Sequence, residues 1–172
     1  MKLRTFPTLL MMLLAATIAT TQPSSATAPA GPSASGQGGF AFFNVFREVP
    51  QFEQWEFSFD AKANKQGHAR GRAIFTISET EVVVKIDCLE VQGSSEFASA
   101  IMTGTVLHSD NPNYPQRANV VFAAVDNSGS PIFRQDIITP LFVFSPGFAN
   151  DCHDIGSPLT MFQVGDSITI EP

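Results

Sequence analysis

The sequence predicts an all-β protein, built as an antiparallel β-sandwich or a small β-barrel of roughly eight strands with one disulfide. Three observations lead to this prediction. Apolar and polar residues alternate with a period of two over several short segments. Clusters of Gly, Pro, Asn, Asp and Ser separate these segments. Beyond residue 26, no window has a sustained helical period. The sequence does not distinguish the sandwich from the barrel.

The alternation is clearest over residues 69–77, 82–88 and 118–124. In the first of these segments, alanine, phenylalanine and isoleucine share one face, and arginines share the other. The full set of predicted strands covers residues 40–47, 54–61, 69–77, 82–88, 96–108, 118–124, 136–144 and 166–170. Turn signals lie between them at residues 64–67, 92–94, 110–115, 126–129 and 145–147.

The N-terminus has the pattern of a secretory signal peptide, which we place at residues 1–26. Lys2 and Arg4 precede an apolar run, and small residues follow it. Residues 27–39 contain only small residues, Pro and one Gln, so we predict a disordered linker there. A single β domain should then occupy residues 40–172. The mature protein should be secreted or periplasmic.

The chain is acidic, with 10 Lys and Arg against 16 Asp and Glu and a formal net charge of −6. Cleavage after residue 26 would remove Lys2 and Arg4 and no acidic residue, so the charge would fall by two more. Such a charge disfavours nucleic acids and anionic membrane surfaces as partners. Apart from the signal peptide, no segment is apolar and long enough to span a membrane. We expect a monomer without a cofactor.

Phenylalanine is unusually frequent, with 16 Phe against one Trp and one Tyr. Many of these residues lie in the segments 40–47 and 54–61. One interpretation is a hydrophobic core, because Phe buries a large apolar area and has no polar group to satisfy. The other interpretation is an apolar ligand cavity inside a small barrel.

The two cysteines, Cys88 and Cys152, predict one disulfide in an exported protein. Cys88 is expected on the inward face of a valine-rich strand, and Cys152 follows a later strand. The segment around Cys152 is NDCHD (residues 150–154), which also permits a metal site or a catalytic thiol beside His153. Neighbouring residues of an extended chain point to opposite sides, so the catalytic arrangement fits poorly. We expect Asp151 and Asp154 to shape turns.

The sequence contains only weak signals for other metal or catalytic sites. The histidines His68, His108 and His153 each stand alone in their segment, so we predict no metal site. No Ser-hydrolase elbow, zinc-protease motif or phosphate-binding glycine loop is present in the sequence. Two pairs of carboxylates would serve as acid and base only if folding brought their members together: Glu53 with Glu56, and Asp126 with Asp136. We therefore predict no catalytic residue.

A loop near residue 112 is the best sequence candidate for a binding edge. It carries Asn111, Asn113, Tyr114 and Arg117, and Tyr and Arg contribute strongly at interfaces. Loops on rigid β scaffolds commonly hold the binding function. The alternative is an ordinary surface loop with two prolines.

Several short pieces follow one another in order: residues 67–71 (GHARG), 85–93 (KIDCLEVQG), 104–112 (GTVLHSDNP), 120–129 (VVFAAVDNSG), 136–138 (DII) and 141–156 (LFVFSPGFANDCHDIG). Through these pieces, the chain from about residue 67 to its end resembles a family of uncharacterised secreted bacterial all-β domains that carry one disulfide. The resemblance implies an all-β fold and supports pairing Cys88 with Cys152. It brings no activity and no catalytic residue.

From these observations we expect an exported bacterial β domain that acts as a non-catalytic binding or interaction module at or beyond the cell envelope. Its ligand would be extracellular or periplasmic. The alternative is a small secreted barrel enzyme, or a carrier for an apolar small molecule. That alternative would use the Phe-rich segments as a cavity wall and an embedded Asp, Glu or His as acid or base.

Overall fold

The computed structural model describes residues 31–44, 51–64, 68–94, 97–130, 132, 135–144, 152, 161–165 and 167–172. These residues form ten strands and no helix. The strands are β1 (Ser33–Asn44), β2 (Gln51–Ala63), β3 (His68–Ile77), β4 (Thr80–Ser94), β5 (Phe97–Ser109), β6 (Asn119–Asp126), β7 (Asp136–Ile138), β8 (Phe142–Phe144), β9 (Phe162–Val164) and β10 (Ile168–Glu171).

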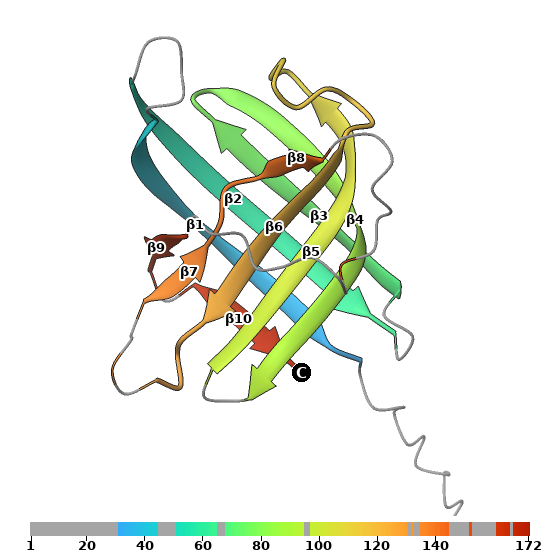
Figure 1. Ribbon diagram of the computed structural model, residues 1–172, viewed down its shortest axis with the longest axis vertical. Coiled ribbons are helices and arrows are strands. Elements are labelled where there is room, and N and C mark those ends of the chain that lie inside the picture. Colours follow the sequence, from blue (N-terminus) through green and yellow to red (C-terminus); the bar gives the residue numbers. More distant parts are fainter. Residues whose placement is uncertain are drawn as a thin grey trace, which may run out of the picture.

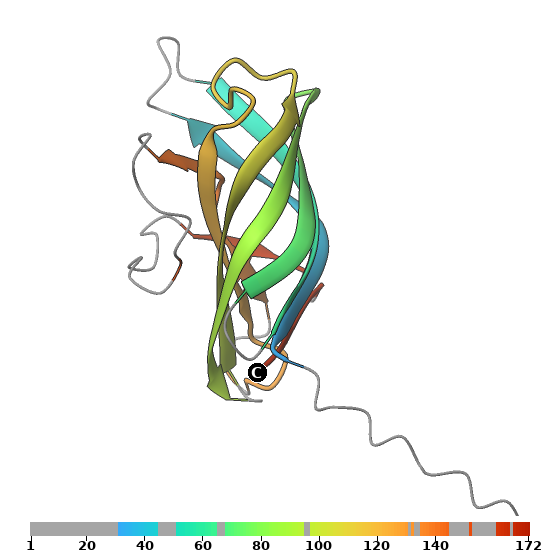
Figure 2. The ribbon, with the colours of Figure 1, turned by 90° about the vertical axis from the view of Figure 1, so that its right-hand side faces the viewer.

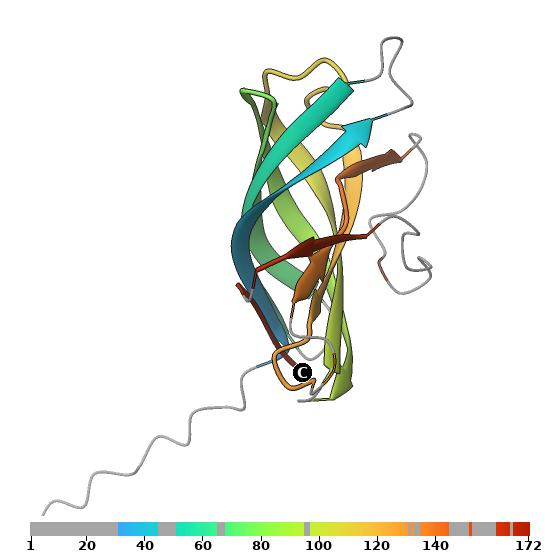
Figure 3. The same ribbon diagram turned by 90° about the vertical axis from the view of Figure 1, so that its left-hand side faces the viewer.

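The strands make one antiparallel sheet in the order β10-β1-β2-β3-β4-β5-β6-β7-β9, and β8 also pairs with β6. Strands β1 to β6 follow one another as a meander, and the sheet is strongly curled (Figures 1, 2 and 3). The first and last strands of this order, β10 and β9, are neighbours in the chain. Their closeness brings the two edges of the sheet together into a half-barrel, which confirms the all-β prediction and corresponds to the barrel alternative.

Aromatic and aliphatic side chains fill the middle of the half-barrel. Alternate residues of β2 point inward, which gives a regular pattern of buried and exposed positions along this strand. The rings of Phe59 and Phe75 pack edge-to-face on Phe122, with centroids 5.6 and 5.1 Å away. All three side chains are buried. Phe40, Phe57 and Phe59 of the Phe-rich segments are thus buried in the core, whereas Phe43 is exposed.

Residues 33–39, which we predicted as part of a disordered linker, instead form the first half of β1. This part of β1 pairs with β10 on one side and β2 on the other. Small residues are needed there because aromatic rings from β2 lie close beneath the backbone. A Cβ atom at Gly36 would lie 2.9 Å from the Phe59 ring, and one at Gly38 would lie 3.1 Å from the Phe57 ring. Linker residues 27–30 and the signal-peptide segment lie outside the described residues.

The predicted strand 136–144 is split into β7 and β8, which pair with successive parts of β6. One extra residue on the β7–β8 side makes a bulge. Thr139 fills the break in the ladder, because its Oγ1 accepts the N–H of Ala123 at 2.9 Å and its own N–H donates to the Ala123 carbonyl. Strand β9 was not predicted, and predicted strand 166–170 corresponds to β10.

Two aspartates join β10 to the β6–β7 connection. The Oδ2 atom of Asp136 accepts the N–H groups of Ser167 and Ile168 at 2.8 and 2.7 Å. The Oδ2 atom of Asp126 accepts the N–H of Ile170 at 3.1 Å. These carboxylates thus bind backbone donors that a neighbouring strand would satisfy in a continuous sheet. The arrangement holds the two edges of the half-barrel together.

Cys88 lies on the outer face of the sheet, although alternation predicted the inner face. A β-bulge in β4 causes the change, because the register against β5 shifts between Ile86 and Cys88. Ile86 and Leu89 both belong to the interior core. The extra residue, Asp87, moves Cys88 to the other face.

The disulfide joins Cys88 to Cys152, with their Cα atoms 5.8 Å apart. Cys152 is fully buried, and both cysteines pack with Ile101, Val121 and Ala123 in a second hydrophobic cluster. This cluster lies on the outer face of β4, β5 and β6 and is separate from the interior core. The predicted disulfide is confirmed, and it attaches Cys152 to the outer face of the sheet.

Candidate functional site

A pocket of about 370 Å³ lies at one end of the half-barrel. The residues that line it come mainly from the end of β1, the start of β2, the β5–β6 connection and the segment that leads into β8. Figure 1 shows where these elements lie. Its aromatic wall consists of Phe42, Trp55, Tyr114 and Phe142, and its polar groups come from Asn44, Glu53 and Asn113. We call it the mouth pocket.

Glu53 is the charged group of the mouth pocket, and it is only 2% exposed. It lies two residues before Trp55 in β2, so both side chains point to the interior. The Nε1–H of Trp55 donates a hydrogen bond to Oε2 of Glu53 at 3.2 Å. This hydrogen bond orients the Glu53 carboxylate on the wall of the pocket.

Ring contacts hold the aromatic wall in place. The Trp55 indole lies 6.1 Å from the ring of Phe42 and 6.2 Å from that of Tyr114, measured between centroids. Phe42 also packs on Phe162 of β9 at 4.7 Å. The hydroxyl of Tyr114 donates to the carbonyl of Leu141 at 3.1 Å, which ties the β5–β6 connection to the segment before β8. The wall is therefore built before any ligand arrives, which lowers the entropic cost of binding.

The predicted binding loop divides into pocket residues and turn residues. Asn113 and Tyr114 line the mouth pocket. Asn111 is buried and shapes the turn, since its Oδ1 accepts the N–H of Asn113 and its Nδ2 donates to Thr80. Arg117 is exposed, has a positive φ of 70° and does not line the pocket.

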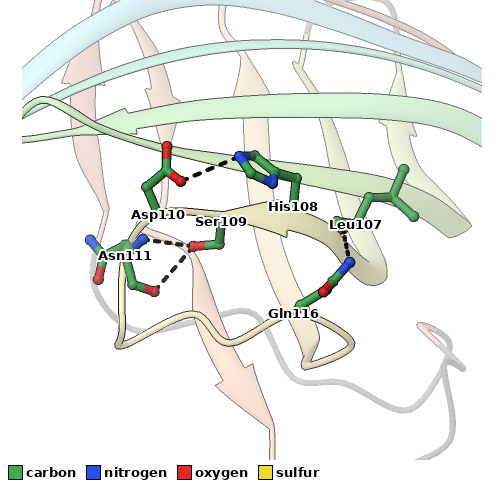
Figure 4. Close-up of polar contacts among 6 residues, drawn as sticks. All are labelled: Leu107, His108, Ser109, Asp110, Asn111 and Gln116. Atoms are coloured by element: carbon green, nitrogen blue, oxygen red, sulfur yellow. Dashed lines mark hydrogen bonds and ion pairs between the residues drawn. The ribbon is translucent and has the colours of Figure 1, made fainter.

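The base of this loop is closed by its own polar contacts (Figure 4). Oγ of Ser109 accepts the N–H of Asn111 at 3.0 Å, and Nε2 of Gln116 donates to the carbonyl of Leu107 at 2.8 Å. His108 and Asp110 form an exposed contact of 3.4 Å between Nε2 and Oδ1. These contacts fix the loop that carries Tyr114.

The structure separates one pair of candidate carboxylates and joins the other. Glu53 points inward, whereas Glu56 is exposed on the outer face of β2. Asp126 and Asp136 both bind backbone N–H groups of the C-terminal segment, as described above. The Oδ1 atoms of these two aspartates accept further backbone N–H groups within the β6–β7 connection. We therefore assign Asp126 and Asp136 a structural role.

The disulfide bears on the metal site and the catalytic thiol that the NDCHD segment permitted. Cys152 is oxidised with Cys88, so neither is a free thiol. Asp151, His153 and Asp154 lie outside the described residues. His68 and His108 are exposed. Within the described ranges, no three His, Cys, Asp or Glu side chains gather as metal ligands.

Comparisons with known proteins return no relative. No family model matches the chain, and no curated protein and no solved structure matches it. The resemblance to secreted bacterial β domains therefore stays a prediction. Among the described residues, no helix is both long and apolar enough to span a membrane.

Proposed function

We propose that this protein is a non-catalytic binding module that acts outside the cytoplasm and holds a small ligand in the mouth pocket. The observation that carries the proposal is the buried Glu53 carboxylate within a preformed aromatic wall. A pocket of about 370 Å³ is within the size range of small-molecule sites, which combine apolar walls with a few placed polar groups. The disulfide is compatible with an oxidising compartment.

The chemistry of the pocket defines the ligand class. Phe42, Trp55 and Tyr114 offer ring faces and edges to a flat or ring-shaped apolar body. Glu53 offers a negative charge and hydrogen-bond acceptors. An ammonium group gains from both, through a charge-assisted hydrogen bond and cation–π attraction. We therefore propose a small organic amine with an aromatic or aliphatic ring as the ligand.

An enzyme is the second candidate, and Glu53 is the observation that favours it. A buried carboxylate in a pocket is a common general base. In this alternative, Glu53 would remove a proton from a bound molecule, and Trp55 would orient the carboxylate through its hydrogen bond. Turnover of a ring-bearing substrate, abolished by Glu53→Gln, would distinguish an enzyme from a binding module.

Trp55 is the only tryptophan of the chain, so its fluorescence reports on the mouth pocket. Titration with benzylamine should give a saturable change in emission with a dissociation constant on the order of 1 mM, as expected for a fragment of this size. Benzoate has a similar ring and the opposite charge, and it should give no saturable change. Equal responses to both compounds, or a response to neither, would contradict the proposal.

A further inference from the structure

A cluster of basic residues lies on the outer face of an otherwise acidic protein. The described ranges contain five Lys and Arg residues, and four of them are neighbours on β2, β3 and β4. The strand register puts Lys62 opposite Arg70, and Arg72 opposite Lys85. Arg70 and Arg72 are two residues apart on one strand, so their side chains share a face. We call these four residues the basic patch.

The basic patch places like charges next to one another across strands. Like charges directly opposite each other in a sheet repel, as in the pairs Lys62–Arg70 and Arg72–Lys85, whereas Asp60 of β2 lies opposite Arg72 on its other side. Lys85 has an ion pair with Asp87 at 2.6 Å. No ion pair within the described residues involves Lys62, Arg70 or Arg72. Lys62 and Arg70 in particular are exposed and face each other as like charges, which suits them to an anionic partner.

The surroundings of the basic patch are polar and hollowed. One depression next to Lys62 and Arg70 is also lined by Asp60, Asn64 and His68. A second depression next to Arg72 carries serine side chains from β1 and β2 together with Asp60 and the half-buried Ile74. The described large apolar side chains that are exposed all lie at other positions: Phe43, Phe52, Phe97, Leu107, Ile132, Phe142, Val143 and Met161. The surface thus offers charges and hydrogen-bond donors, while none of the described exposed large apolar side chains lies there to insert into a lipid surface.

We propose that the basic patch binds an anionic polysaccharide, a polymer that carries carboxylate or sulfate groups and hydroxyls. Arg and Lys would bind the anionic groups, and the serine, asparagine and histidine side chains would bind sugar hydroxyls. The net charge of −6 argues against a stiff, densely charged duplex or a membrane, which would also meet the acidic remainder of the surface. The patch is toward the opposite end of β2 from Glu53, so this site is separate from the mouth pocket.

Dextran sulfate provides the probe, with neutral dextran as its control. Binding to the full chain is measured by titration calorimetry at low and moderate salt. We compare the double variant Lys62→Gln/Arg70→Gln, the single variant Arg70→Gln and the matched variant Arg117→Gln, which removes an exposed charge elsewhere. Each contact between a cation and the polymer releases a counterion, so the affinity should fall as salt is raised. The double variant loses two such contacts and should bind dextran sulfate about tenfold more weakly. Arg117→Gln should change the affinity less than about twofold.

Folding of the variants is checked by their melting temperatures and by benzylamine titration. The double variant removes a repulsive pair, so its melting temperature should stay the same or rise. Benzylamine binding should not change. The proposal is overturned if the full chain does not bind dextran sulfate at low salt, or if Arg117→Gln weakens binding as much as Arg70→Gln. Equal binding to duplex DNA or to anionic phospholipid vesicles would overturn the assignment to a polysaccharide.

Discussion

The indole Nε1–H of Trp55 donates to Oε2 of Glu53 across 3.2 Å, and both side chains are almost fully buried. A buried carboxylate is costly unless it is hydrogen-bonded, so this contact stabilises the charge inside the pocket. It also fixes the plane of the indole that forms the aromatic wall. Glu53 and Trp55 therefore act together in the proposed binding of a ring-bearing amine.

Glu53→Gln should weaken benzylamine binding about tenfold, because it replaces a charge-assisted hydrogen bond by a neutral one. The Gln carbonyl can still accept the Trp55 N–H, so the fold should remain. Binding of benzyl alcohol, which has no charge, should change less than about threefold. Fluorescence titration of Trp55 measures both affinities. An equal loss for the two ligands would show that the charge of Glu53 is not what the amine recognises.

Tyr114→Phe should lower the free energy of unfolding by about 1 kcal/mol, since it removes the hydrogen bond to the Leu141 carbonyl. The phenyl ring would remain against Trp55, so benzylamine should still bind. Urea denaturation gives the stability change. Asn113→Ala serves as the control. Asn113 is exposed, so this substitution should lower the free energy of unfolding by less than about 0.5 kcal/mol. A larger cost at Asn113 than at Tyr114 would contradict this account of the loop.

Asp136→Asn should destabilise the protein by about 3 kcal/mol, because the buried carboxylate accepts three backbone N–H groups and an amide offers only one oxygen. Asp110→Asn makes the same chemical change at an exposed position and should cost less than about 0.5 kcal/mol. Chemical denaturation of both variants tests the role of Asp136 in holding the sheet edges together. Similar stability of the two variants would refute that role.

Reduction of the disulfide should lower the free energy of unfolding by about 4 kcal/mol on the chain-entropy model, given the 64-residue separation of Cys88 and Cys152. The same change is expected for the double variant Cys88→Ala/Cys152→Ala. A thiol assay on the denatured, unreduced protein should find no free thiol. Two thiols per chain would contradict the pairing.

Alternation predicted the strands well because one face of each strand is buried. It failed where the backbone departs from a regular ladder. Cys88 was assigned to the wrong face because the bulge at Asp87 leaves no mark in the pattern of apolar residues. The β7–β8 segment was predicted as one strand because Thr139 lies within an apolar run, while its position at the break depends on a tertiary contact with Ala123.

Composition was misleading where small residues have a packing role. Gly36 and Gly38 suggested disorder, yet they admit the rings of Phe57 and Phe59 beneath β1. The net charge likewise does not show where the charges lie, and the register of β2–β4 places Lys62, Arg70, Arg72 and Lys85 together on one face. Both effects depend on which residues become neighbours across strands, and composition holds no information on that.

The mouth pocket was predicted only in part. Tyr114 and Asn113 were named because of their residue types, but Glu53 was paired with Glu56 and placed before the predicted strand 54–61. Extension of that strand by a few residues would have put Glu53 on the same inward face as Trp55 and Phe57. A glutamate in line with buried aromatic residues was the available signal.

Two-dimensional NMR of the ¹⁵N-labelled protein gives the most direct test of the mouth pocket, because one tryptophan contributes one indole N–H signal. With benzylamine up to a concentration on the order of 10 mM, this signal should shift in a saturable way. Backbone signals of Glu53, Asn113 and Leu141 should shift with the same dissociation constant. Shifts confined to other strands, or an indole signal that does not move, would contradict the proposal that the pocket beside Glu53 and Trp55 is the binding site.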